Sequence, residues 1–168
     1  MDTNADTCCL GQNFVVLQYT QRTAEVFAYD DSLGSKTILI VSGATAYTCP
    51  NTHETYILVV NEALYYGKRL NHSLFNPNQV RMYNNPLWDN PFDVYHPIGI
   101  ELRELFIPFH TKGTKLLFRT RAPTAQELEN CVHLHLTSKK PWNPRRVKLS
   151  KIEVEVSQVE GGSNDYDP

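Results

Sequence analysis

The chain has 168 residues, of which 41% are hydrophobic and 20% are charged. This size fits one ordinary domain, or one small domain with an extension, and the composition excludes an intrinsically disordered protein. The sequence lacks both the roughly 18-residue apolar run of a membrane span and the basic and apolar regions of a secretory signal. We therefore expect a cytoplasmic protein with no membrane partner, and free thiols on its four cysteines.

The predicted elements are mostly strands. In chain order they lie at 14–19, 23–29, 37–41, 56–60, 98–102, 106–109, 115–119, 132–136 and 151–156. The polar segment 30–35 predicts a turn, and the turn-forming residues 49–54 predict the tip of a long hairpin. Thr124 predicts the start of a short helix at 125–130, and the prolines of 84–97 indicate a surface connection without long helices.

The formal charge of −2 conceals an uneven distribution. Residues 111–152 carry ten basic and two acidic side chains, whereas residues 153–168 are acidic. Such a basic stretch can bind phosphate or an acidic partner. It can equally be a solvated face whose charge the acidic end offsets, because it lacks the interleaved aromatic motif of a nucleic-acid-binding module.

The N-terminal residues 2–7 read Asp-Thr-Asn-Ala-Asp-Thr. A carboxylate followed by a hydroxyl residue and small residues is the pattern that a tight active-site loop requires. The Asp must face a partner, the hydroxyl must bond to the backbone, and the small residues let two loops approach each other. Turns select the same residue types, so this segment alone is also consistent with a simple N-terminal turn.

A second segment, together with residues 2–7, indicates a resemblance to a known family. Residues 2–7 resemble the D-[ST]-G-A-D-x-T signature of retropepsin-type aspartic proteases. Residues 63–80 resemble V-L-Y-V-P-x-L-x-x-N-L-L-S-V-x-Q-L, the segment that closes the protease region of copia-type retrotransposon polyproteins. The outright matches in this second segment are Leu64, Tyr65, Leu70, Leu74 and Gln79. The resemblance covers about residues 1–83, and the remainder resembles the β-rich spacer that follows the protease in some copia-like elements.

The resemblance implies a mainly β protein. It divides the chain into a retropepsin-like closed β-barrel subunit at 1–83, a connection at 84–97, a basic β-rich spacer at 98–157 and a flexible tail at 158–168. It further implies an aspartic endopeptidase that acts as a homodimer, cleaves extended segments of its own polyprotein and needs no metal or organic cofactor. The expected location is the cytoplasm, within a virus-like particle.

The resemblance also assigns roles to the N-terminal loop. Asp2 is the catalytic carboxylate, Thr3 braces the paired loops through its hydroxyl, and Ala5 and Asp6 line the substrate-binding floor. Two facing Asp2 groups would share one proton and titrate as a coupled dyad. Asn4 stands where the family has Gly, and Asn is the next best residue for positive φ. The strand that leads to this Asp in the family has no counterpart before Asp2.

The hairpin tip at 44–55 corresponds in position to the family's flap, the strand pair that closes over a bound peptide. The candidate flap residues are Thr48, Cys49, Pro50, Asn51 and Thr52. A different class of function stays open, in which the chain is a non-catalytic retroelement remnant or a recruited dimerisation module. Nucleic-acid binding through residues 111–152 is the third hypothesis.

Two further sequence patterns bear on function. Cys131, His133 and His135 alternate, so a strand would place these potential zinc ligands on one face. They lack a fourth ligand and the spacing of a zinc finger, which favours a mixed sheet surface. Trp88 and Trp142 each lie near Pro and Asp or Asn, and we interpret them as loop anchors.

Overall fold

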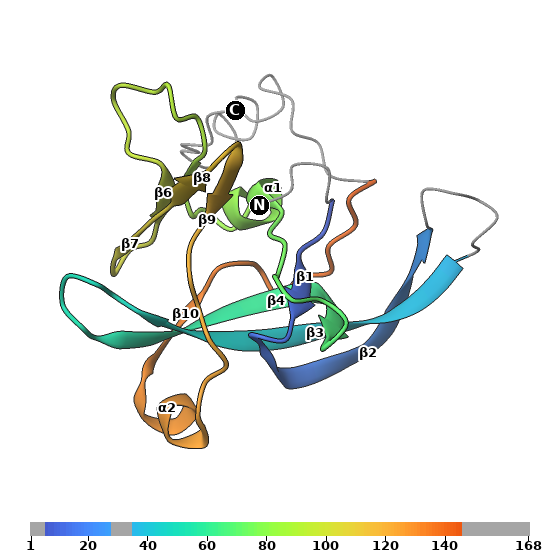
Figure 1. Cartoon of the computed structure of the whole chain (residues 1–168). Helices are drawn as coiled ribbons and strands as arrows, with labels where there is room; N and C mark the ends of the chain where they lie inside the picture. Colours follow the sequence, from blue (N-terminus) through green and yellow to red (C-terminus); the bar gives the residue numbers. More distant parts are fainter. Residues whose placement is uncertain (1–5, 28–34, 146–168) are drawn as a thin grey trace, which may run out of the picture.

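The computed structural model describes residues 6–27 and 35–145, and this part of the chain is mainly β (Figure 1). The largest sheet has the order β1-β4-β3-β2, with β10 also paired to β4, and two smaller sheets contain β5-β6-β7 and β8-β9. The strands are β1 (Cys9–Gly11), β2 (Val15–Phe27), β3 (Ser35–Thr48), β4 (Thr55–Gly67), β5 (Leu87–Trp88), β6 (Gly99–Glu101), β7 (Phe106–Pro108), β8 (His110–Lys112), β9 (Lys115–Leu117) and β10 (Val132–His135). The helices are α1 (Pro77–Arg81) and α2 (Ala125–Asn130).

Two long antiparallel hairpins form the frame of the main sheet. The two strands predicted at 14–19 and 23–29 are one continuous strand, β2, in which the pairing register shifts between Tyr19 and Thr23. Gln21 has a φ of 67° at this shift, so the chain bulges without leaving the sheet. The gap between the two predicted strands is therefore an irregularity within one strand.

β4 is the central strand, and most of its residues are buried. β3 lies along one edge of β4, while β10 and β1 share the opposite edge and both run parallel to it. A second bulge interrupts the β3–β4 pairing, because Ser42 alone faces the two residues Asn61 and Glu62. Glu62 has a φ of 55°, which is uncommon for a residue with a side chain.

The main sheet has a packed layer on each face (Figure 1). On one face Ile100 and Ile107 of a small sheet, with Phe109 just after it, join a hydrophobic cluster that also contains Leu10 and Leu58 of the main sheet. On the other face a smaller cluster contains Ala44, Ala46, Ile57 and Val59, against which Leu128 of α2 packs. Residues before 83 and residues after 97 therefore contribute to the same hydrophobic core, although the predicted domain division falls between them.

The closed β-barrel expected from the resemblance is not found in residues 6–27 and 35–145. The main sheet is open, with β2 at one edge. Closure would require β2 to pair with β1 or β10 at the opposite edge, and the described strands make no such pairing. The coarser expectation of a mainly β fold is confirmed.

The local signals for the short helix are confirmed. α2 begins after Thr124, whose hydroxyl accepts from the Glu127 N–H while the Glu127 carboxylate accepts from the Thr124 N–H, a capping box. Sequence patterns did not reveal α1, a five-residue helix with Asn76 as N-cap and Pro77 in its first turn. No described helix is long and apolar enough to cross a membrane.

Candidate functional site

The predicted catalytic loop lies only partly within the described residues. Asp2, Thr3, Asn4 and Ala5 are outside them, as are the strand predicted at 151–156 and the tail at 158–168. Asp6 is the first described residue, and its side chain is exposed. The Thr7 hydroxyl donates to its carboxylate across 3.3 Å. The structure therefore fixes the point at which the loop joins the fold.

Two side chains from distant parts of the chain hold the Asp6 carbonyl. The Asn76 side-chain amide donates to this oxygen across 2.6 Å, and the Trp142 indole N–H donates to it across 2.8 Å. A carbonyl with two donors has both lone pairs satisfied. Trp142 is thus a loop anchor, and it anchors the loop that carries the candidate site.

The segment that follows the loop is inserted between two other stretches of chain. Cys9 exchanges two backbone hydrogen bonds with Leu74, of 2.7 and 2.8 Å, and on its other side the Leu64 N–H donates to the Cys8 carbonyl across 2.9 Å. Leu64 and Leu74 belong to the segment 63–80. The structure therefore places the second resembling segment, 63–80, against the two residues that directly follow the first.

Gln79 completes this junction. Its side-chain carbonyl accepts from the Cys8 N–H across 3.0 Å, and its amide nitrogen donates to the carbonyls of Asn61 and Glu62. Gln79 is 3% exposed, so these bonds form away from water. The two carbonyls belong to the bulge in β4, and the unusual backbone at Glu62 is therefore held by a side chain from α1.

A buried carboxylate lies beside the loop anchor. The Glu62 side chain, 3% exposed, forms a two-point ion pair with the Arg22 guanidinium from β2 and also accepts from the Trp142 backbone N–H across 2.9 Å. The side-chain hydrogen bond between Arg22 and Glu62 is the largest cause that raises the pKa of Arg22 above its ordinary value. Trp142 thus links the Asp6 carbonyl to the Arg22–Glu62 pair.

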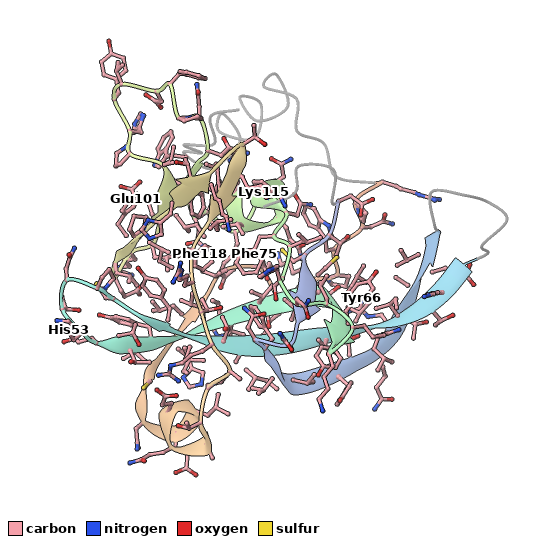
Figure 2. All side chains as sticks on the ribbon, in the orientation of Figure 1. His53, Tyr66, Phe75, Glu101, Lys115 and Phe118 are labelled. Carbon is pink, nitrogen blue, oxygen red and sulfur yellow. The ribbon has the colours of Figure 1, made fainter. Side chains whose placement is uncertain are left out.

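The candidate flap residues form a compact turn between β3 and β4. The Cys49 N–H donates to the Glu54 carbonyl, the His53 N–H donates to the Cys49 carbonyl, and His53 adopts a φ of 62°. A side-chain hydrogen bond from Thr52, with the Thr52 and Asn51 backbone N–H groups, holds the pKa of the Cys49 thiol below its ordinary value. Figure 2 shows His53 at the far end of this hairpin.

The base of this turn is held by later parts of the chain. The Tyr47 ring packs edge-on against Phe118, with ring centroids 6.3 Å apart, and Ala46 exchanges two backbone hydrogen bonds with Arg121. The β2–β3 hairpin is as long, and Figure 1 shows its outer end projecting beyond β1 and β4. Sequence reasoning assigned the flap to 48–52 without weighing this other hairpin, and that assignment stays a prediction.

The alternating Cys131, His133 and His135 do not gather as a ligand set. The His133 imidazole Nδ1 lies 3.0 Å from the Cys131 carbonyl, and the His135 Nδ1 lies 3.1 Å from the Asn61 side-chain nitrogen. Burial, followed by the charges of Lys139 and His133, lowers the pKa of His135. Within the described ranges no group of three His, Cys, Asp or Glu side chains could hold a metal ion.

Comparison with protein-family models, curated proteins and solved structures found no match. Function is therefore inferred from the residues themselves. Sequence reasoning missed the anchoring roles of Asn76 and Glu62, because each acts on a residue more than 35 positions away. Only Gln79 carried a signal, since it matches the family segment.

Proposed function

We propose that this chain is the aspartic endopeptidase subunit of a copia-like retroelement polyprotein. The observation that carries the proposal is that the second resembling segment holds the end of the first and the residues after it: Asn76 bonds to the Asp6 carbonyl, and Leu64, Leu74 and Gln79 bond to Cys8 or Cys9. Residues 2–7 can act as a catalytic loop only when a fixed scaffold holds them in place. The double anchoring of the Asp6 carbonyl supplies such a scaffold at the end of the loop.

The active unit is a homodimer, because each chain offers one Asp2. Two facing carboxylates at contact distance cannot both ionise cheaply, so the pair shares one proton. The ionised member accepts a proton from the attacking water, while the protonated member donates to the peptide carbonyl. Thr3 braces the paired loops, Asn4 takes the position of the family's Gly, and Ala5 and Asp6 form the floor under the peptide.

The substrate is an extended peptide segment of the parent polyprotein. An extended peptide exposes its backbone groups, so neighbouring strands can bind it without strong dependence on side chains. This binding mode suits a protease that cleaves several different junctions. Neither a metal ion nor an organic cofactor takes part in the proposed reaction.

The experiment is cleavage of a library of extended peptides at about pH 5, with and without a pepstatin-like inhibitor. Asp2→Asn removes the ionisable group and is expected to reduce kcat/KM by at least about 100-fold. Glu129→Gln, an equally small change at an exposed position of α2, should leave cleavage unchanged. Cleavage that survives Asp2→Asn would overturn the assignment of that residue.

The same preparation separates the protease from a non-catalytic module. Sedimentation measures whether the chain is dimeric under the assay conditions. A dimer that cleaves no peptide across the library contradicts the proposed activity and supports a remnant in which only dimerisation persists. A coupled dyad also predicts a bell-shaped dependence of kcat/KM on pH, with apparent pKa values that belong to the pair.

A further inference from the structure

An open groove lies between the chain segments 71–75 and 112–120 and encloses about 1080 Å³. Its floor is aromatic, because the Phe118 ring lies 5.4 Å from the Phe75 ring and 5.8 Å from the Phe109 ring, centroid to centroid. Figure 2 shows Phe75 and Phe118 side by side above the main sheet, with Lys115 nearby. The groove is a surface separate from the anchors of Asp6.

Each wall of the groove contains two residues whose backbone groups form no hydrogen bond with another described residue. Within the described part of the chain, the backbone groups of Asn71 and His72 on one wall make no hydrogen bonds. The same is true of Phe118 and Arg119 on the other wall. Unpaired backbone edges are templates for an added strand, because an extended segment can satisfy both its own groups and theirs. The groove therefore suits an extended peptide.

The rim of the groove is positively charged. Lys112, Lys115 and Arg119 line it and are exposed, while no Asp or Glu is among its lining residues. None of these three cations forms an ion pair with another described residue. Clustered cations without partners favour an anionic occupant.

The chain itself contains a segment of matching pattern. Residues 152–156 read Ile-Glu-Val-Glu-Val, and residues 153–168 carry five acidic and no basic side chains. In an extended segment the three apolar residues share one face and the two Glu side chains share the other. A segment with one apolar and one acidic face matches the chemistry of a groove with an aromatic floor and a basic rim.

The segment is also within reach. Trp142 and Asn76 donate to the same Asp6 carbonyl, across 2.8 and 2.6 Å, and Asn76 directly follows Phe75 in the groove. The ten residues from Trp142 to Ile152 span up to about 33 Å when extended. Linkage through a short flexible chain gives an effective concentration in the millimolar range, which favours docking within one molecule.

We propose that residues 152–156 dock in this groove as an additional strand of the same molecule. Their apolar side chains cover Phe118, their carboxylates pair with Lys112 and Lys115, and their backbone groups bond to the two groove walls. This interaction does not depend on peptide cleavage, because it involves none of the residues of the proposed catalytic loop. The docking and the proposed peptidase activity can therefore be tested independently of each other.

Hydrogen exchange on the full chain, read by mass spectrometry, tests the docking. In the unaltered protein we expect the amides of 152–156 to exchange at least about tenfold more slowly than in the groove variant Lys112→Glu/Lys115→Glu or the tail variant Glu153→Lys/Glu155→Lys. Combining the two variants swaps the charges and should restore protection. The matched control Lys139→Glu/Lys140→Glu, at exposed positions outside the groove, should leave protection unchanged.

Three results would overturn the proposal. The first is exchange of 152–156 at the rate of an unstructured peptide in the unaltered protein. The second is protection that survives the groove variant, which would place the segment elsewhere. The third is protection that increases with protein concentration, which would indicate docking between two copies. Protection of the buried β4 amides in every variant verifies that the fold is intact.

Discussion

The side-chain carbonyl of Gln79 accepts a 3.0 Å hydrogen bond from the backbone N–H of Cys8, a residue 71 positions earlier. The Gln79 amide also donates to the Asn61 and Glu62 carbonyls, across 3.2 and 2.8 Å. The side chains of Gln79 and Thr137 therefore fill the stretch of the β4 edge that lies between β10 and β1. This stretch connects the candidate catalytic loop to the centre of the main sheet.

Gln79→Ala should destabilise the protein by about 2–4 kcal/mol, because it leaves buried backbone groups without partners. The measurement is urea unfolding at neutral pH. Gln18→Ala, at an exposed position of β2, is the matched control and should change stability by less than about 0.5 kcal/mol. Equal shifts of the two unfolding midpoints would contradict the role of Gln79.

Arg22→Ala should lower stability by about 1.5–3 kcal/mol, because it strips the buried Glu62 carboxylate of its charge-assisted partner. Adding Glu62→Gln should recover part of this loss, since a neutral amide tolerates burial better than an unpaired carboxylate. The two single variants and the double variant form a cycle in thermal unfolding. A double variant whose loss is simply the sum of the two would count against the pairing.

Phe118→Ala tests whether the later residues share a core with the main sheet. The Phe118 ring contacts Tyr47, Phe75 and Phe109, and we expect a loss of about 2–4 kcal/mol on its removal. Phe92→Ala removes an equal side chain that is 87% exposed and should change stability by less than about 0.5 kcal/mol. Two independently folding halves would instead give two unfolding transitions, of which the substitution shifts only one.

Acid stability should depend on Arg121. Its hydrogen bond to Glu127, followed by the Thr124 backbone N–H, lowers the pKa of Glu127 to about 2 from 4.5. A lowered folded-state pKa stabilises the protein above about pH 4.5, and this stabilisation is lost as the pH falls from about 4.5 to about 2. Arg121→Gln should therefore lower Tm at about pH 5 and lower it less at about pH 3.

The control for this comparison is Arg103→Gln, at an exposed position outside the described ion pairs. It should leave the difference in Tm between the two pH values as it is in the unaltered protein. An Arg121→Gln variant with the same deficit at both pH values would show that Glu127 does not titrate in this window.

Local patterns predicted the local elements. The capping box at Thr124 and Glu127 lies within four residues. The hairpin strands are short runs of β-branched, aromatic and apolar residues, so short windows contain the information. Two strands were predicted where the structure has one, because the register shift and the bulge at Gln21 depend on the pairing with β3. The pairing of β10 with β4 left no signal in either strand.

The candidate site shows the same difference between local sequence patterns and contacts that are distant in sequence. Residues 2–7 and Gln79 were noted from their resemblance, while Trp142 was interpreted only as a loop anchor. That its indole holds the Asp6 carbonyl depends on a fold that brings together residues 136 positions apart. The closed barrel was expected from the family resemblance alone. No residue pattern favoured it over an open sheet.

The order in which strands occupy the β4 edge has a consequence for synthesis of the chain. Val132 pairs with Tyr56, and Thr137 bonds to Asn61, so this part of the edge stays bare until residues 132–137 leave the ribosome. Pairings this distant in sequence form slowly, and a bare central strand can recruit strands from other nascent chains. A chain released near residue 83 would therefore aggregate, although it contains both segments of the resemblance.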